Sequence, residues 1–288
     1  MSTIKIFKKA QKGHYAIGQF NVSTDEHLRA IIEVARDFKS PVIIGTSEGE
    51  RKFIGIKQVV ALVKIWEKIA KLPIILNADH CKTFNSAKQA IDAGYSAIHI
   101  DGSTLPLKRN INLTKKVVKY AKSKNKKIIV EGELGYLKGG SEVHKKKTKI
   151  SLEDLTKVEE AKKMVKETGI DTLAAVVGNM HGIESNMKNP NLYLDRLKEI
   201  QKAVPKTCLV LHGGSGTPEN DIKKAIKLGV VKININTELR IAYSNALRKT
   251  LKENPDTVKP YEILAPSIEA MKEVVKKKIE LFGSKGKS

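Results

Sequence analysis

Eight short apolar runs recur along the chain, and each ends in polar or glycine residues before a segment with helical periodicity. Strands that are covered on both faces of a parallel sheet have such nearly continuous apolar runs. Eight alternations of strand and helix favour a closed (β/α)8 TIM barrel over an open, doubly wound sheet. The predicted strands lie within Tyr15–Asn21, Pro41–Ser47, Pro73–His80, Ser96–Ser103, Lys127–Gly135, Asp171–Gly182, Cys208–Gly216 and Val230–Thr237.

No tandem repeat, proline-rich linker or low-complexity segment divides the 288 residues, a length that is typical of one α/β barrel. We therefore expect residues 1–288 to form a single domain. The apolar pattern continues after the eighth strand, and it predicts an additional C-terminal helix over about Ser267–Phe282 that packs outside the barrel.

Hydrophobic residues make up 41% of the chain, which excludes a disordered protein. The two cysteines, Cys81 and Cys208, stand in strand-like contexts and predict no disulfide, in keeping with a reducing compartment. The basic N-terminus lacks the apolar stretch of a signal peptide, and no apolar run reaches the roughly 18 residues of a membrane span. These features predict a cytoplasmic protein that does not bind membranes.

The formal net charge of +22 comes almost entirely from lysine, and a charge of this size is compatible with nucleic acid or with anionic substrates. The lysines are spread along the whole chain, however, and few aromatic residues lie between them to stack on bases. Solvated helix faces therefore explain the charge better than a nucleic-acid interface does. A basic nucleic-acid-binding barrel remains the non-enzymatic alternative.

Polar side chains that can do chemistry gather where the predicted strands end. In these barrels, active sites are built at the rim formed by the carboxyl ends of the strands. A purely structural protein has no reason to place acids, imidazoles and amides at one rim, so the pattern predicts an enzyme. The residues at this predicted rim are Asn21, Ser47, Asp79, His80, Asp101, Glu133, His181, His212 and Asn234.

Three of the seven histidines, His80, His181 and His212, each end a different predicted strand. Glycine follows the last two and lets the backbone approach a ligand closely. Three imidazoles with an open fourth position are typical of a catalytic zinc site, and no pairs of cysteines compete for that role. We therefore predict one Zn²⁺ per chain, held by these three histidines.

The other four histidines carry structural predictions. His99 alternates onto the same strand face as Asp101, and we expect it in the barrel interior or at the rim, but not as a ligand. His144 stands among lysines in a loop, which predicts a solvated side chain. His14 and His27 precede or open helices and are expected at the surface.

The last two predicted strands both end in features that bind anions. The seventh ends in HGGSG (residues 212–216) before a helix, and the eighth ends in Asn234–Thr237 before another. Successive glycines expose backbone N–H groups, and a helix N-terminus favours an anion. The loops after strands 7 and 8 are the usual phosphate site of these barrels. Two such ends at adjacent strands predict a phosphate pocket, whereas one alone would suit an ordinary turn.

Taken together, the motifs resemble those of the class II fructose-bisphosphate aldolases and of the closely similar tagatose-bisphosphate aldolases. The resemblance covers nearly the whole chain, and the set is highly specific although each motif alone is weak. The motifs are GQFN (18–21), TSEG (46–49), DH (79–80), IDGS (100–103), EGELG (131–135), GNMHG (178–182), HGGSG (212–216), KIN (232–234), TE (237–238) and IELFGS (279–284).

The resemblance implies the metal site and the acid/base residues. The same three histidines match the zinc ligands, and Asp79 matches the acid/base that handles the C4 oxygen of the sugar. Asp101 and Glu133 match carboxylates near the metal, which in some members hold a second or alternative metal position. Glu142, in the mobile loop after strand 5, matches the residue that moves the proton at C1 of the triose.

The resemblance also implies a pocket for dihydroxyacetone phosphate and residues that position the rest of the substrate. Many members carry a lysine soon after the His-Gly of strand 6, whereas this chain has Ser185 near that place and Lys188 slightly later. A phosphate contact by Lys188 is therefore an open question. The implied substrate-binding residues are Asn21, Ser47, Gly182, Gly213, Gly214, Ser215, Asn234, Ile235, Asn236 and Thr237.

The loop around Glu142 departs from the family pattern. Family loops usually have Gly-Gly-x-Glu-Asp/Glu, whereas this chain has GGSEV (139–143), followed by lysines from Lys145 to Lys147. The glycines and the low apolar content predict a loop that is mobile without substrate and closes over it. The nearby lysines would help to attract a bisphosphate by charge.

The implied activity is the reversible cleavage of fructose 1,6-bisphosphate to dihydroxyacetone phosphate and glyceraldehyde 3-phosphate, in glycolysis and gluconeogenesis, by a homodimer or homotetramer. The sequence leaves tagatose 1,6-bisphosphate open as the substrate, and it does not distinguish Zn²⁺ from Co²⁺ or Fe²⁺. The alternative chemistry is an aldolase that forms a Schiff base on lysine. Lys232 lies on the eighth strand, but no lysine stands convincingly at a strand end beside the phosphate loops.

Overall fold

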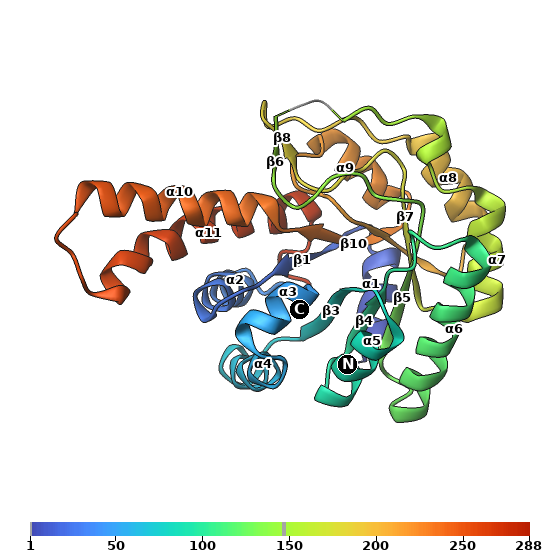
Figure 1. The fold of residues 1–288 in the computed structure, drawn as a ribbon, viewed down its shortest axis with the longest axis horizontal. Coiled ribbons are helices and arrows are strands. Elements are labelled where there is room, and N and C mark those ends of the chain that lie inside the picture. Colours follow the sequence, from blue (N-terminus) through green and yellow to red (C-terminus); the bar gives the residue numbers. More distant parts are fainter. Residues whose placement is uncertain (1, 146–147) are drawn as a thin grey trace.

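Eight parallel strands close into a barrel in the computed structural model, which describes residues 2–145 and 148–288 (Figure 1). Their order around the barrel follows the chain, and the last strand pairs with the first to close it. Each strand coincides with one of the predicted runs, so the predicted fold class is confirmed. The strands are β1 (Ile17–Asn21), β2 (Val42–Thr46), β3 (Ile74–Cys81), β4 (Ala97–Ile100), β5 (Ile129–Leu134), β7 (Thr172–Ala175), β9 (Cys208–Leu211) and β10 (Val230–Ile235).

Helices surround the barrel and cover the outer faces of its strands (Figure 1). They form because their apolar residues recur three or four positions apart, so that each helix has one face to bury. In α2, for example, Leu28, Ile31, Ile32 and Ala35 are all buried. The helices between strands are α2 (Asp25–Asp37), α3 (Glu48–Ile54), α4 (Ile56–Ala70), α5 (Phe84–Ala93), α6 (Leu107–Lys124), α7 (Val158–Thr168), α8 (Leu194–Ala203) and α9 (Glu219–Lys227), with a short 3₁₀ turn, η1 (Leu152–Asp154).

The lower part of the barrel interior is an apolar layer. Residues two apart on a strand point to the same side, and one residue from each of several strands meets at the bottom of the barrel. A helix that the sequence analysis did not anticipate, α1 (Thr3–Lys12), covers this layer with Ile6, Phe7 and Ala10. The strand residues of the layer are Ile17, Ile43, Ile75, Ala97, Ile129, Cys208 and Val231.

The middle of the barrel interior is polar, although the strands looked almost continuously apolar in sequence. The Asn77 amide donates to Gln19 Oε1 at 2.8 Å, and the Lys232 ammonium lies 2.7 Å from Glu131 Oε2. All four side chains are buried. This layer supports the residues above it, at the carboxyl ends of the strands.

Two long helices at the end of the chain form a hairpin that projects from the barrel: α10 (Thr237–Glu253) and α11 (Pro260–Phe282) (Figure 1). The predicted C-terminal helix is present, but it begins at Pro260 instead of Ser267. In the structure Pro266 lies inside α11, and the turns before it pack beside α10.

His27 was expected at the surface, and that expectation is wrong. The side chain is buried between α2 and α10, where its ring stacks on Tyr243 with centroids 5.1 Å apart. Its Nδ1 atom lies 3.0 Å from Thr24 Oγ1. Burial lowers the pKa of His27 to about 4. The sequence pattern of α2 alone could not show that a distant helix covers this position.

Two further strands, β6 (Val143–His144) and β8 (Ile183–Glu184), form a small parallel pair above the barrel (Figure 1). They join the loop after β5 to the loop after β7, and the sequence analysis predicted neither. Cys81 and Cys208 are both buried and free, as expected. Among the helices in the described parts of the chain, none is long and apolar enough to cross a membrane.

Candidate active site

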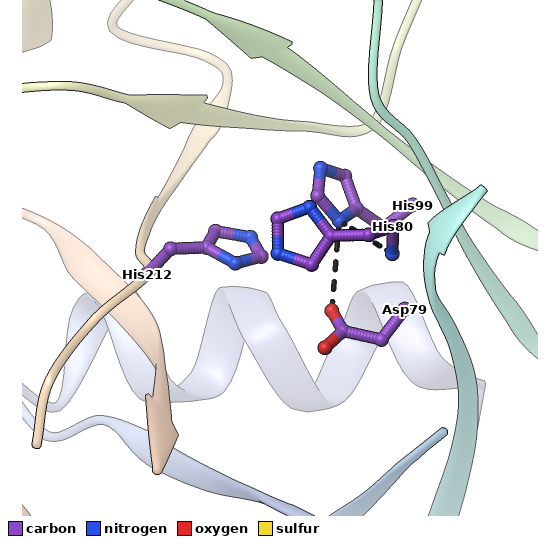
Figure 2. Close-up of side chains that lie close together, drawn as sticks. All are labelled: Asp79, His80, His99 and His212. Carbon is purple, nitrogen blue, oxygen red and sulfur yellow. Dashed lines mark hydrogen bonds and ion pairs between the residues drawn. The ribbon is translucent and has the colours of Figure 1, made fainter. Parts of the chain in front are cut away.

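The end of β3 carries two neighbouring residues that both face the site. In a regular strand consecutive side chains point to opposite faces. The pairing between β3 and β4 shifts register between Ala78 and Cys81, and His80 has a φ of +47°, in the left-handed region. A bulge of this kind redirects a side chain. Asp79 and His80 therefore both reach the cluster of imidazoles shown in Figure 2.

His80 is oriented by a carboxylate from the neighbouring strand. Its Nδ1 lies 2.7 Å from Asp101 Oδ2, and Asp101 in turn accepts from the backbone N–H of Ser103 at 3.1 Å. Burial would raise the pKa of Asp101, but the hydrogen bond to His80 and the nearby charges hold it far below its usual range. The carboxylate therefore fixes the imidazole with Nε2 free, which is how metal-bound histidines are commonly held.

His212, just after β9, is oriented in the same way by a residue that the sequence analysis gave no role. Its Nε2 lies 2.7 Å from Glu131 Oε1, and the other oxygen of Glu131 accepts from Lys232. Burial opposes ionisation, yet the Lys232 charge and the His212 hydrogen bond keep the pKa of Glu131 well below its usual value. Lys232 is thus held in a buried ion pair, which does not suit a Schiff-base nucleophile.

His181 does not end a strand as predicted. β7 ends at Ala175, and His181 lies in the following loop, with its ring 4.9 Å from that of His80. Its backbone N–H donates to the Lys138 carbonyl at 2.9 Å. Burial, with the nearby His80 charge, lowers the pKa of His181 to about 3. The imidazole is therefore neutral near pH 7, as a metal ligand must be.

His144 was expected to be solvated, and the structure corrects this. The side chain is half-buried, and its Nε2 lies 2.9 Å from the His181 carbonyl and 3.0 Å from the Gly140 carbonyl. It therefore joins the loop after β5 to the backbone of His181. The surrounding lysines suggested solvent, but the β6–β8 pairing brings the two loops together.

Asp79 is surrounded by donors at the centre of the site. The Asn21 side-chain amide donates to its Oδ2 at 3.0 Å, and the Asn234 amide donates to its Oδ1 at 3.2 Å. Burial would raise the pKa of Asp79, but the charge of His80, the neighbouring His99 ring and the charge of His212 hold it well below its usual range. The carboxylate is thus ionised.

His99 is one of the four clustered side chains in Figure 2, and it is fully buried, in keeping with the expected interior position. Its Nδ1 accepts the His80 backbone N–H at 3.1 Å, and its Nε2 lies 2.8 Å from Glu133 Oε2. His99 Nε2 and Glu133 Oε2 are close, but they do not form a hydrogen bond, and neither atom has another hydrogen-bond partner in the described structure. Both ring nitrogens of His99 therefore face groups of the protein, at the interior position that the sequence analysis expected.

The donor set fits a divalent cation. One potential ligand atom each from Asp79, His80, His99 and His212 lies within 4.8 Å of the others, and His80, Asp101 and Glu133 form a second such group. Four carboxylates surround this cluster, those of residues 79, 101, 131 and 133, and all are buried. The described ammonium groups of Lys82 and Lys232 pair with two of them, Asp101 and Glu131. The other two face imidazoles, and a buried group of this many carboxylates favours a bound cation.

A cavity of about 210 Å³ opens above these residues. A cavity of this size suits a small metabolite. Most of the predicted substrate residues line it, while Gly214 and Ile235 do not. The Gly214 N–H donates to the Asn234 carbonyl at 3.0 Å, and Ile235 is in the core. The cavity is lined by Asn21, Ser47, Asp79, His80, Ser141, His181, Gly182, His212, Gly213, Ser215, Asn234, Asn236, Thr237 and Arg240.

Other predicted residues lie away from this cavity. Glu142 is exposed in the loop before β6 and is not part of the lining, although its neighbour Ser141 is. Lys188 is exposed and also absent from the lining. Of the three predicted loop lysines, Lys145 is exposed, whereas Lys146 and Lys147 lie outside the described residues.

Sequence reasoning missed a pair of charged residues at the cavity. Arg240 is the one lysine or arginine in the lining formed by the described residues, and its guanidinium lies 2.7 Å from Glu50 Oε1. Glu50 is buried, accepts from the Asn21 amide at 2.9 Å and caps the Ser47 backbone N–H at 2.7 Å. The Ser-x-x-Glu spacing of a capping box was a signal that could have identified Glu50.

Comparison with known families identifies the barrel. A family model described as "Fructose-bisphosphate aldolase class-II" matches residues 1–287. The chain is a member of the class II fructose-bisphosphate aldolase family. Like other class II aldolases, it is expected to depend on a metal, and the His80-centred cluster is the place in the described structure that suits one.

Individual class II aldolases with related sequences carry different names. A "6-phospho-5-dehydro-2-deoxy-D-gluconate aldolase" of Bacillus licheniformis is 41% identical over 100% of this chain and 96% of its own length. A "Fructose-bisphosphate aldolase" of Geobacillus stearothermophilus is 38% identical over 100% of this chain and 98% of its own. Among solved structures, the YdjI aldolase of Escherichia coli superimposes with a TM-score of 0.82 at 32% sequence identity. The match covers 100% of this chain and 98% of the YdjI chain.

Proposed function

We propose that this class II aldolase cleaves fructose 1,6-bisphosphate reversibly to dihydroxyacetone phosphate and glyceraldehyde 3-phosphate. One observation carries the proposal: His80, His181, His212 and Asp79 converge on a cavity that also has features for binding anions. Aldol chemistry needs a polarised carbonyl and groups that move two protons, and the anion-binding features suit a phosphorylated sugar.

His80, His181 and His212 would hold the metal, which we propose to be Zn²⁺. When bound, a divalent ion supplies Lewis-acid stabilisation of the negative charge that develops on the triose oxygens. Asp101 and Glu131 each hold one of these imidazoles with a hydrogen bond of 2.7 Å. His144 supports the backbone of the third. The ligands are therefore preorganised by the chain itself.

Asp79 would take the proton of the C4 hydroxyl in cleavage and return it in condensation. The Asn21 and Asn234 amides fix the carboxylate and leave it ionised. Glu142 would move the proton at C1 of the triose. Because Glu142 is exposed outside the cavity lining, this role requires the loop to move inward when substrate binds.

Two features of the cavity suit the two anionic ends of a bisphosphate. Thr237 begins α10, and Gly213 and Ser215 line the cavity from the loop after β9, with Ser215 Oγ accepting from the Glu238 backbone N–H of α10 at 3.4 Å. Backbone N–H groups at a helix N-terminus favour a phosphate. Arg240 adds a guanidinium, which binds phosphate or carboxylate well. It is paired with Glu50, so an incoming anion would compete with that carboxylate.

The second candidate is a phosphorylated sugar acid, suggested by the name of the Bacillus licheniformis relative. Such a substrate carries a carboxylate in place of one phosphate, and Arg240 suits either anion. Tagatose 1,6-bisphosphate is a third possibility, because its two phosphates match the same features.

Cleavage assays decide between these substrates. The purified enzyme would be given each of the three compounds, before and after exhaustive chelation. The highest kcat/KM on fructose 1,6-bisphosphate supports the proposal, and a higher value on either other compound replaces it. Full activity after chelation would exclude the metal site.

We further propose a homodimer or homotetramer in the cytoplasm. The projecting α10–α11 hairpin supports the oligomer, because Leu251, Val258 and Tyr261 on it are exposed apolar side chains. Such residues are favoured at interfaces between copies. Light scattering on the purified chain would measure its mass, and a monomeric mass would reject this part of the proposal.

A further inference from the structure

A lysine lies among the carboxylates next to the proposed metal site. Lys82 follows the last residue of β3, and its ammonium group forms an ion pair with Asp101 Oδ2. The side chain is half-exposed at 51%, while that of Asp101 is only 3% exposed. The lysine therefore reaches inward from the surface to a buried carboxylate.

The surroundings of Lys82 are strongly negative. Besides its partner Asp101, the carboxylates of Glu133 and Glu48 lie near its ammonium group. Asp101 and Glu133, together with His80, form the second of the two groups whose ligand atoms lie within 4.8 Å of one another. The ammonium group therefore lies beside Asp101 and Glu133, a pair of carboxylates that would otherwise attract a metal ion.

The His80 ring connects the two groups. Its Nδ1 lies 2.7 Å from Asp101 Oδ2 and 3.7 Å from Glu133 Oε2, so the second group faces the N–H side of the ring. One imidazole can present Nε2 to the first group while Nδ1–H donates to Asp101. With Nδ1 already facing Asp101, the ring has no second nitrogen to offer another ion. A fixed ammonium balances the carboxylates without using a ring nitrogen.

We propose that the Lys82 ammonium is a built-in cation at Asp101 and Glu133, which limits the chain to one divalent ion at the histidine site. This inference rests on the metal site of the proposed function. Lys82 is a positioning residue in this scheme: by holding Asp101 it keeps His80 oriented, and by its charge it excludes a second ion.

The test is metal stoichiometry, measured by mass spectrometry of the metal after Zn²⁺ loading and removal of free ions. The folded wild-type chain is expected to retain one ion. Lys82→Met removes the charge while keeping a long side chain, and it should retain close to two. Lys82→Arg keeps the charge and should retain one. Lys88→Met, which removes an exposed partner of Asp92, is the matched control and should also retain one.

A double variant locates the additional ion. Lys82→Met with Asp101→Asn removes a proposed ligand, so it should lose the second ion that the single variant gains. Circular dichroism and thermal melting would confirm that each variant is folded, and Lys82→Gln replaces Lys82→Met if the latter does not fold.

The outcomes separate this inference from the proposed function. Two ions in the wild type, or one ion in every folded Lys82 variant, would overturn the role of Lys82 and leave the histidine site intact. No retained ion in the wild type would overturn the metal site itself. Because the readout is bound metal, it does not depend on which sugar phosphate is the substrate.

Discussion

The floor and the wall of the cavity are built in different ways. On the floor, Asp79 and His212 lie on or directly after barrel strands and are fixed by at least two hydrogen bonds or ion pairs each. The wall is the loop after β5, in which Ser141 lines the cavity while Glu142 is exposed outside the lining, and this loop is held through backbone contacts of the β6–β8 pair. Side chains on strands can be positioned before substrate arrives, whereas a loop can close after it. The difference suggests that the floor binds the metal and the wall responds to substrate.

The largest expected effect comes from removing His181, the one proposed ligand that belongs to a loop. His181→Ala should lower bound metal below one ion per chain and reduce cleavage by about 10³-fold or more, because several kcal/mol of charge stabilisation is lost. Metal analysis and steady-state cleavage rates would measure both. A variant that keeps its metal would show that the floor alone holds the ion.

The next effect concerns the stability of the floor. Glu131→Gln leaves Lys232 buried without its charged partner, and the loss of one member of a buried pair costs about 3–5 kcal/mol. Urea unfolding of the metal-free chain would measure the free energy of unfolding. Glu159→Gln removes an exposed partner of Lys162 and should change it by about 1 kcal/mol or less. If the two substitutions lowered the free energy of unfolding equally, the buried ion pair would be no more important for stability than the exposed one.

Asp79 tests whether a floor residue is a catalyst or a ligand. Asp79→Ala should keep the metal and the fold but slow cleavage by about 10²-fold or more, the loss expected for a general acid/base residue. Bound metal and kcat would be measured on the same preparation. If the metal disappears together with the activity, Asp79 is a ligand and the proposed assignment fails.

The smallest expected change is on the wall. Glu142→Gln preserves size and hydrogen bonding, so metal content and phosphate binding should stay nearly unchanged. Exchange of the triose C1 proton with solvent should slow by about 10²-fold. Glu153→Gln, a second exposed glutamate that follows the loop, is the matched control. An unaffected exchange rate would assign the base to another group, such as Glu133.

The barrel and its catalytic rim could be predicted from the sequence because both follow from a local pattern. Each apolar run indicates a strand, and the residue that follows it marks the rim. Asp79, His80 and His212 were located in this way, and the structure places them together. His181 was assigned to a strand end because the apolar residues before it continue past the end of β7.

The remaining features depend on contacts between distant segments. Glu131 and Lys232 meet across the barrel interior, and nothing near either residue in the sequence indicates the other. The Glu50–Arg240 pair likewise joins α3 to α10. The β6–β8 pair is too short for a periodic signal. A single sequence specifies such partners only through the completed fold.

The closure of the barrel by its first and last strands has a consequence during synthesis. Ile17 of β1 pairs with Lys232 of β10, and the Ala16 N–H donates to the Phe282 carbonyl at 2.9 Å. At roughly 5–20 residues per second, the ribosome needs about 10–40 s after making β1 before β10 is complete. Throughout that interval the nascent sheet has two open edges, which are templates for pairing with other chains. The first strand must therefore be protected from aggregation until nearly the whole polypeptide has emerged.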